Sequence, residues 1–543
     1  MTVQLAAATG PEARRGGTIS ILDLLDESAS GHGTFHVPGD EPEPTSMSQL
    51  WSASERSARW IAAHIGTGAT VAAVLTNTRA CVATLLGAWR AGSTVASLPL
   101  PARGMQPEIY AEQLQRFCSA AGAHALLLDP TQAVLLDDAA LSVHTFDETL
   151  LGGPHFSSHD DGALVQFTSG SVGTPKGIHL SLDAVAANCL AIVDALAPGP
   201  DESLCSWLPL SHDMGLIGQL LSPLVAGAPH FGHHSLTLMK PETFMANPRS
   251  WLRTCSDTGA TISVVPNFAL DLAVRTSRRL GALDLSRMQS IVIGSETVRA
   301  ETLMQFTDAF EPAGFRPRAL CPAYGLAEAT LAVTITRPHQ PWRAIAHRDP
   351  LAPPGTTPRL LVSTGPPVTR VDVRVAAPPG DVGRVELRSP SQLSRYIGAD
   401  LPITNDGYFT TGDIGLMDEG ELFVVGRGDE AIIVAGRNVF PEDIETAIEH
   451  ESIRRGCIAA VAAPDGGLAV VVEPKGIMSD AELETACRGI RTATASRTGY
   501  SPATVAFVPR GSLPKTPSGK LRRLAISKSL VAGDGFLARV DFG

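Results

Sequence analysis

The chain has 543 residues, of which 44% are apolar and 18% are charged, and its formal net charge is −12. This composition is typical of a globular protein, and at roughly 100–200 residues per domain the length suits about three or four packing units. The acidic balance argues against a general nucleic-acid binder or a protein that binds anionic membranes, because both need a basic surface.

The first third of the chain alternates strand-like and helix-like segments. Buried strands are predicted at residues 70–76, 93–100 and 124–129, and helices at 79–92 and 108–122 lie between them. A β-α-β-α-β order favours a parallel sheet that is covered by helices. The expected fold class is therefore α/β.

Four further predicted strands end in polar or glycine-containing loops. These loops contain Thr168, Asn267, Gly294 and Tyr324. Ligands of open α/β sheets gather beyond the carboxyl ends of the strands, so we expect these four residues to face one cleft.

The composition and the predicted elements change twice in the second half of the chain. Residues 335–400 are rich in Pro, Thr, Arg and Gly and contain short alternating strands, which predicts a smaller β subdomain. From Asp429 onward strands and helices start again, and about 115 residues can hold a core of their own. We therefore predict a large N-terminal domain of mainly parallel sheets, residues 1–428, and a small mobile C-terminal α+β domain, residues 429–543.

The cysteines and the termini bear on metal binding and compartment. None of the eight cysteines forms a C-x-x-C pair, so neither a disulfide framework nor a structural zinc site is expected. His230, His233 and His234 form a small cluster, but no Cys or carboxylate completes a metal site there. The N-terminal segment has no apolar run long enough for a signal peptide, and the longest apolar stretch, residues 81–100, is interrupted by Arg90. We expect no membrane span and a cytoplasmic location.

A loop of hydroxyl residues and glycines, residues 168–177, directly follows a predicted strand. Backbone N–H groups in such a loop cradle phosphate oxygens, and Lys176 adds a point charge. The loop is not a Walker A motif, because Pro175 and Gly177 break that spacing. The alternative is an ordinary polar surface loop. The candidate phosphate-binding residues are Thr168, Ser169, Gly170, Ser171, Gly173, Thr174 and Lys176.

Three further motifs each carry one candidate side chain. Glu328 in YGLAE is a carboxylate of the kind that holds Mg²⁺ beside phosphates, or a solvated residue that starts a helix. Asp413 in a TGD turn can accept hydrogen bonds from ribose hydroxyls, or it is a plain turn residue. Lys520 lies in a basic segment near the C-terminus, for which the alternative is a solvated tail. Each of these motifs is weak when it is considered alone.

The four motifs together resemble the adenylate-forming superfamily of acyl-CoA synthetases, peptide-synthetase adenylation domains and luciferases, over about residues 45–530. Within that superfamily the chain looks most like the fatty acyl-AMP ligases. This resemblance implies that ATP converts a fatty acid to an acyl-AMP with release of pyrophosphate. The acyl group then passes to the phosphopantetheine thiol of an acyl carrier protein. The segments that carry the resemblance are residues 207–216, 266–270, 324–331 and 435–445.

Two alternatives to this function stay open. One is an acyl- or aryl-CoA ligase that uses free CoA, and the other is a non-catalytic acyl- or nucleotide-binding protein. Residues 336–364 stand where the marker insertion of the fatty acyl-AMP ligases lies, although the stretch is shorter, and Asp429 occupies the hinge position as it does in CoA ligases. The intact Glu328, Asp413 and Lys520 count against a non-catalytic protein.

The resemblance also implies roles for single residues. Lys520 bridges the substrate carboxylate and the α-phosphate, Glu328 binds Mg²⁺, and His212 completes the implied catalytic set. ATP and Mg²⁺ are the implied cofactors, and Asp429 is the implied hinge. The implied nucleotide-binding residues outside the loop described above are Gly294, Ser295, Glu296, Tyr324, Gly325, Asp413 and Arg427. The implied substrate pocket consists of His212, Asp213, Asn267 and Gly294.

The small domain contains arginines that are candidates for docking an acidic carrier protein. Opposite charges on the two proteins would raise the association rate, and the effect would weaken with salt. The alternative is that these side chains are simply solvated. The arginines concerned are Arg454, Arg455, Arg522 and Arg523.

Overall fold

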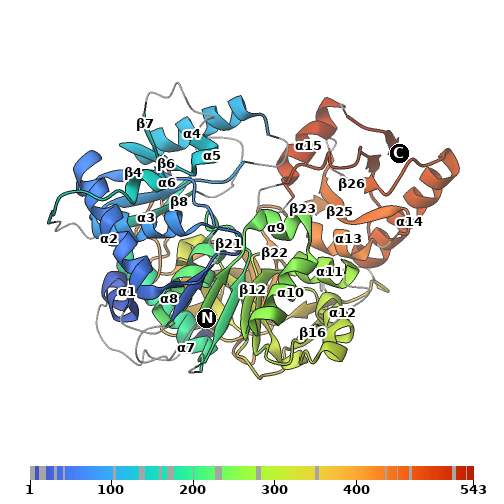
Figure 1. The fold of residues 1–543 in the computed structure, drawn as a ribbon. Helices are drawn as coiled ribbons and strands as arrows, with labels where there is room; N and C mark the ends of the chain where they lie inside the picture. The colour runs from blue at the N-terminus through green and yellow to red at the C-terminus, as the bar shows by residue number, and fades with distance from the viewer. Residues whose placement is uncertain are drawn as a thin grey trace.

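A computed structural model gives the fold, which has a larger body with the C-terminal elements, drawn in orange and red, on one side of it (Figure 1). The structure describes residues 6–10, 20–29, 33–40, 43–101, 105–133, 141–157, 162–167, 176–199, 201–226, 235–276, 283–348, 354–434, 437–448, 450–463, 467–515, 521–533 and 535–542.

A seven-stranded sheet is built mostly from the first third of the chain, in the order β20-β9-β8-β5-β4-β6-β7. Strands β8, β5, β4, β6 and β7 are parallel, while β9 and β20 add antiparallel pairs at one edge. The predicted parallel β-α-β-α-β order is therefore confirmed. The strands are β4 (Thr70–Ala73), β5 (Thr94–Ser97), β6 (Ala125–Leu128), β7 (Ser142–Thr145), β8 (Ala163–Phe167), β9 (Gly177–Ser181) and β20 (Arg395–Ile397).

Helix α3 (Arg79–Arg90) illustrates why the local sequence folds as it does. The Thr78 hydroxyl accepts a hydrogen bond from the Cys81 N–H at 3.2 Å and so caps the helix. A Cβ at Gly87 would lie 2.7 Å from the backbone oxygen of Ser54, so glycine allows α2 to pack closely against α3. The other helices of the large domain are α1 (Ile21–Ala29), α2 (Met47–His64), α4 (Pro107–Ala121), α5 (Pro130–Ala133), α6 (Phe146–Thr149), α7 (Leu182–Leu196), a π-helix (Met214–Leu221), α8 (Ser222–Ala226), α9 (Pro241–Ala246), α10 (Arg249–Thr258), α11 (Asn267–Thr276) and α12 (Ala300–Phe310).

An eight-stranded sheet follows, in the order β15-β14-β13-β12-β10-β11-β2-β3. Its six central strands are parallel, and the two edge pairs are antiparallel. The parallel strands β12, β13 and β14 bring their carboxyl ends to one edge, which positions the site described below. The strands are β2 (Thr34–His36), β3 (Thr45–Ser46), β10 (Ser203–Ser206), β11 (Ser235–Leu238), β12 (Ile262–Pro266), β13 (Ser290–Gly294), β14 (Leu320–Gly325) and β15 (Ala332–Ile335).

The predicted smaller β subdomain is a five-stranded antiparallel sheet, in the order β1-β18-β19-β21-β22. It extends beyond the predicted residues 335–400, because it also contains two later strands and one strand from the start of the chain. A separate hairpin, β16-β17, precedes it. The strands are β1 (Ala6–Thr9), β16 (Ala344–His347), β17 (Arg359–Val362), β18 (Asp372–Val375), β19 (Gly383–Arg388), β21 (Phe409–Asp418) and β22 (Glu421–Arg427).

The C-terminal domain is α+β, as predicted. Its four-stranded sheet has the order β25-β26-β27-β28, and a small hairpin, β23-β24, follows the end of β22. The boundary at residues 428/429 stays a prediction. The elements are β23 (Ile432–Val434), β24 (Arg437–Val439), α13 (Pro441–Ala447), β25 (Ile453–Ala462), β26 (Leu468–Pro474), α14 (Asp480–Thr498), β27 (Thr504–Phe507), α15 (Arg523–Ala532) and β28 (Ala538–Asp541).

The structure has the buried apolar cores that the composition predicts. The largest buried side chains include Trp89 and Trp251, and the C-terminal sheet has its own core around Val470 and Phe507. All eight cysteines lie in the described part of the chain, where each is free and buried. Within the described ranges, no helix is both long enough and apolar enough to cross a membrane.

Candidate active site

One large cleft lies at the carboxyl ends of the parallel strands and extends to the C-terminal domain. Its volume is about 2830 Å³. Asn267, Gly294 and Tyr324, which follow or end three neighbouring strands, line it together, as expected from their positions. The other candidate residues that line the cleft are Lys176, His212, Asp213, Ser295, Glu296, Gly325, Glu328, Asp413, Arg427 and Asp429.

Some candidates lie outside the described residues. They include Lys520 and the histidine cluster. The rest of this group belongs to the candidate phosphate loop and consists of Thr168, Ser169, Gly170, Ser171, Gly173 and Thr174. Their roles stay predictions, as do those of the residues that line the cleft.

Tyr324, Asp413 and Arg427 form a polar group on one wall of the cleft. The Tyr324 hydroxyl donates a hydrogen bond to Asp413 Oδ2 at 2.6 Å. Burial raises the pKa of Tyr324 well above its usual value, and the Asp413 charge adds to this effect, so the phenol stays a donor. Asp413 and Arg427 are direct partners across β21 and β22, and Arg427 Nε lies 3.8 Å from Asp413 Oδ1. The group fixes the carboxylate at the cleft surface.

Glu328 is held by a residue that its local sequence does not reveal. The Tyr396 hydroxyl donates a hydrogen bond to Glu328 Oε1 at 2.9 Å, and Lys176 Nζ lies 3.6 Å from the centre of the Tyr396 ring. Burial raises the pKa of Tyr396, with the Glu328 charge adding to the effect. Glu328 lies in a three-residue 3₁₀ turn (Ala327–Ala329) and does not start an α-helix. Tyr396 therefore links the candidate metal ligand to the candidate phosphate-binding lysine.

His212 and Asp213 lie next to each other at the start of the π-helix. His212 Nδ1 is 2.6 Å from Asp213 Oδ1, which also accepts the Met214 N–H at 2.7 Å. The turn is tight, because a Cβ at Gly215 would lie 2.1 Å from the Pro209 oxygen. This geometry presents the His212–Asp213 pair to the cleft.

Asn77 supports this turn from a distant part of the sequence. It is buried, and its amide nitrogen donates to the backbone oxygens of Leu208 at 3.0 Å and Met239 at 2.8 Å. Its amide oxygen accepts the Leu210 N–H at 3.1 Å. Asn77 therefore joins the ends of β10 and β11 and positions the loop that carries His212.

Asn267 and Glu296 are largely committed to backbone contacts. Asn267 Oδ1 accepts the Arg299 N–H at 3.1 Å, and Glu296 accepts the Phe268 N–H. These bonds hold the starts of α12 and α11, whose first N–H groups have no partner within their helix. Both residues line the cleft, and their contacts fix its wall.

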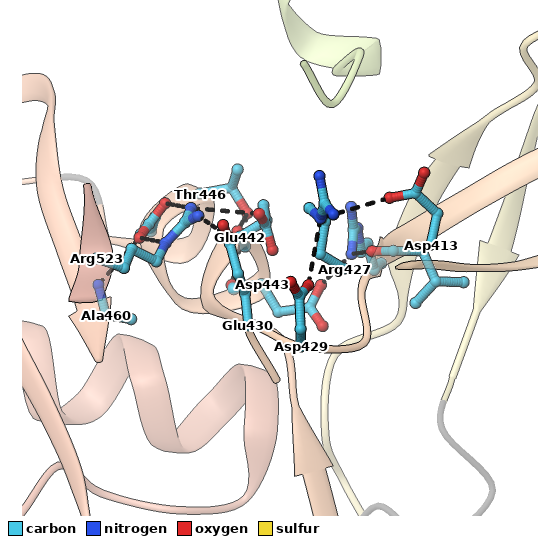
Figure 2. A network of polar contacts seen from close by, with 12 residues as sticks. Asp413, Arg427, Asp429, Glu430, Glu442, Asp443, Thr446, Ala460 and Arg523 are labelled. Carbon is cyan, nitrogen blue, oxygen red and sulfur yellow. Dashed lines mark hydrogen bonds and ion pairs between the residues drawn. The ribbon is translucent and has the colours of Figure 1, made fainter. Parts of the chain in front are cut away.

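Two ion-pair groups meet at the predicted hinge (Figure 2). Arg427 lies between Asp413 and Asp429, with Arg427 Nε 3.2 Å from Asp429 Oδ1. Beside it, Arg523 pairs with Glu430, Glu442 and Glu445. Burial lowers the pKa of Arg523, but the three carboxylates, Glu445 first, outweigh this and raise it. Arg523 is therefore a permanently charged residue within an acidic cluster.

This cluster corrects one expectation about carrier docking. The Arg523 side chain is only 17% exposed and its guanidinium is fully engaged, so it does not present a docking charge. Arg454 is also paired, with Glu473. A charge that leaves water needs a partner, and these acids supply it. Arg522 stays exposed, while the Arg455 side chain lies outside the described atoms.

The hairpin β16-β17 connects the two domains. Arg359 donates to the Val425 oxygen of β22 at 2.7 Å and to Asp443 Oδ1 of α13 at 2.8 Å. The Thr357 N–H donates to the Ser496 oxygen at 2.9 Å, and Arg497 donates to the Pro358 oxygen at 3.0 Å. These bonds fasten the stretch 336–364 to the C-terminal domain.

Comparison with known proteins agrees with this geometry. The family model described as "AMP-binding enzyme" matches residues 25–397, more than half of the chain. The chain belongs to the AMP-binding enzyme family. Its relatives include the long-chain-fatty-acid–AMP ligase FadD26 of Mycobacterium marinum, 35% identical over 419 residues that span 69% of this chain and 70% of that protein. The medium-chain-fatty-acid–[acyl-carrier-protein] ligase JamA of Moorena producens is 34% identical over 417 residues, 70% of this chain and 69% of that protein.

Solved structures give the same family fold. A structure from a study of fatty acyl-adenylate ligases of E. coli and L. pneumophila matches this AMP-binding enzyme with a TM-score of 0.86 and 26% identity. The match covers 95% of this chain and 98% of that one. The large domain and smaller C-terminal domain of this enzyme are those of adenylate-forming proteins.

Sequence reasoning missed three residues that organise the site of this AMP-binding enzyme: Asn77, Arg359 and Tyr396. Each acts on a group far away in the chain, as Tyr396 does on Glu328. None of the three belongs to a local motif. Their only signal in the sequence is the residue type, and the residue type does not indicate which distant group the side chain contacts.

Proposed function

We propose that this enzyme activates a fatty acid as an acyl-adenylate and passes the acyl group to the phosphopantetheine thiol of an acyl carrier protein. The observation that carries the proposal is that one cleft combines two surfaces. A polar wall holds Asp413 and Glu328, and an apolar wall suits an alkyl chain. The apolar wall includes Leu196, Trp207, Met214, Phe268 and Leu331.

In the first half-reaction a carboxylate oxygen of the acid attacks the α-phosphorus of ATP, and the bond to the leaving pyrophosphate breaks. This brings several anionic groups together, so fixed positive and donor groups lower the barrier. In the proposal Asp413 accepts hydrogen bonds from the ribose hydroxyls, and Tyr324 and Arg427 hold it in place. Lys520 bridges the carboxylate and the α-phosphate.

The donor set fits Mg²⁺ bound mainly by phosphate oxygens. Among the described residues no three His, Cys, Asp or Glu side chains gather as a metal cage, and Glu328 supplies one carboxylate in the cleft. Mg²⁺ is commonly held by one or two carboxylates together with substrate phosphates, and when bound it neutralises phosphate charge. Tyr396 orients the Glu328 carboxylate for this contact.

In the second half-reaction the thiol sulfur attacks the acyl carbonyl, and AMP leaves. The hairpin contacts support a carrier-bound thiol over free CoA. Arg359 and Thr357 fasten the C-terminal domain to the large domain and so resist the rotation that would form a binding surface for the CoA nucleotide. A phosphopantetheine arm needs only a narrow channel, because its carrier stays outside.

The test supplies ATP, Mg²⁺ and a medium-chain fatty acid, and then offers CoA and a holo carrier protein separately. We expect pyrophosphate release with the acid, acylation of the carrier and slow or no formation of acyl-CoA. Rapid acyl-CoA formation would replace this proposal with a CoA ligase. Failure to release pyrophosphate with acids of any chain length would leave a non-catalytic binding protein.

The eight free thiols support the further proposal that the enzyme works in the cytoplasm.

A further inference from the structure

Gln166 is a buried amide without partners at the cleft. Its side chain is 5% exposed, yet neither its amide nitrogen nor its amide oxygen has a hydrogen-bond partner. In the described part of the chain it is the one residue with two such atoms. Leaving buried polar groups unpaired costs stability, so such a residue needs an explanation. Gln166 lines the cleft, so a ligand can reach it.

The sheet register places Gln166 beside the candidate metal and phosphate groups. Gln166 pairs with Ile178 on β9, and Ile178 pairs with Tyr396 on β20. Directly opposite residues of neighbouring strands point to the same face, so all three side chains share one face of the sheet. Tyr396 holds Glu328 and contacts Lys176 on this side of the cleft.

A second unpaired group lies on the other side of Gln166. Ser97 on β5 is its direct partner in the parallel pairing, is 2% exposed, and has a hydroxyl with no hydrogen-bond partner. Two adjacent, uncharged and buried polar side chains are therefore unsatisfied at the carboxyl ends of β5 and β8. By contrast, both atoms of the buried Asn188 amide are satisfied. Asn188, fully buried, donates to the oxygens of Ala329 and Ala332 and accepts the Ala332 N–H.

We infer that the Gln166 amide binds the phosphate chain of MgATP. An amide has both donors and an acceptor, so it can donate to a phosphate oxygen and accept from a metal-bound water at the same time. Lys176 and Glu328, on the same side of the cleft, supply the charges that such a ligand requires. The inference rests on the proposed function, because it needs ATP as the substrate. The binding of ATP replaces the missing hydrogen bonds of the free enzyme.

The inference makes opposite predictions for stability and binding. Gln166→Met removes an unpaired amide at similar volume, so the melting temperature of the ligand-free enzyme should stay the same or rise. MgATP, measured by calorimetry without fatty acid, should bind about tenfold more weakly or worse, as for a lost hydrogen bond to a charged group. AMP lacks the terminal phosphates, so its affinity should be unchanged.

The matched control is Gln219→Met. Gln219 is also a buried glutamine with an unpaired amide oxygen, but its amide nitrogen donates to the Val264 oxygen. This variant should lower the melting temperature and leave MgATP affinity unchanged. Unaltered MgATP affinity in Gln166→Met would overturn the inference, and so would a fall in its melting temperature or an equal loss of AMP affinity. A wild-type enzyme that binds no MgATP would instead overturn the proposed function.

Discussion

At the scale of single residues, the site depends on side chains that position others. Tyr324 holds Asp413, Tyr396 holds Glu328, and Asn77 holds the loop before His212. In each case a neutral group donates to an oxygen that would otherwise be free to rotate or move. Such fixed geometry lets electrostatic contacts stabilise developing charge without reorganisation.

Tyr324→Phe should raise the KM for ATP about tenfold, because it removes a hydrogen bond to a charged group. The KM for the fatty acid should change little. Steady-state kinetics with each substrate varied in turn would measure the two effects. Tyr110→Phe is the control, since its hydroxyl donates to the Pro99 oxygen away from Asp413. A larger change in the KM for the fatty acid than in the KM for ATP would contradict the proposed position of the nucleotide.

Lys520→Ala should reduce ATP–pyrophosphate exchange by about 10²–10³, the loss typical of one group that stabilises transition-state charge. Folding and ATP binding should stay close to wild type. Lys528→Ala, on the exposed side of α15, is the matched control. Exchange at the wild-type rate in Lys520→Ala would show that another group bridges the two substrates.

At the scale of secondary-structure elements, much of the large domain could be predicted. Hydrophobic runs and helix periodicity are local properties, so the strands before and after α3 could be predicted. Because ligands of open α/β sheets bind beyond the carboxyl ends of the strands, Asn267, Gly294 and Tyr324 could also be placed at one cleft. The strand β1 was missed, because AAAT has little strand propensity and forms a strand only through its pairing with β18. The contact between the hairpin and the C-terminal domain could not be predicted from the sequence either, because Arg359 bonds to Asp443, which is far away in the chain.

The acidic cluster around Arg523 holds α13, α15 and the segment after the predicted hinge together. Arg523→Met should destabilise the enzyme by roughly 3–5 kcal/mol, because it leaves three carboxylates without their cation. Chemical unfolding followed by circular dichroism would measure the loss. A loss as small as that of Arg488→Met, whose side chain is exposed, would mean that the cluster contributes little.

The pH dependence of this loss follows from the carboxylates. Burial raises the pKa of Glu430 and of Glu445 in the folded enzyme, while Arg523 opposes this effect. Groups with a raised pKa bind protons more readily in the folded state, so their contribution to stability falls as the pH rises from the unfolded to the folded pKa. Without Arg523 the two pKa values rise further. The destabilisation should therefore be larger at pH 8 than at pH 5, and the opposite trend would contradict this account.

At the scale of the whole molecule, the proposed second half-reaction requires the C-terminal domain to turn. Arg359→Met removes the contact that joins β22 to α13. An ion pair of about 1 kcal/mol shifts a two-state equilibrium about fivefold. Acylation of free CoA should rise by about this factor, and acylation of the carrier should change less. Arg348→Met is the control, because Arg348 bonds within the hairpin region, to the Thr356 oxygen. No gain with CoA would show that the hairpin does not limit rotation.

Asp429→Pro should slow acyl transfer more than adenylation. Proline fixes φ near −65°, and a pivot with two backbone states cannot then visit both. Exchange of ATP with pyrophosphate reports the first half-reaction, and carrier acylation from preformed acyl-AMP reports the second. Asp429→Ala keeps backbone freedom and serves as the control. Equal loss of both half-reactions, or of neither, would place the pivot elsewhere.

The pairing of β1 with β18 has a consequence for synthesis of the chain. Ala6 lies opposite Val375, so the two strands are roughly 370 residues apart in the sequence. At about 5–20 residues per second, the ribosome needs roughly 20 to 70 seconds between them. During that time the amino-terminal strand has no partner. It becomes the outer strand of its sheet only after most of the large domain has left the exit tunnel. A fusion partner at the amino terminus would therefore stay linked to an unpaired strand until most of the large domain has been synthesised.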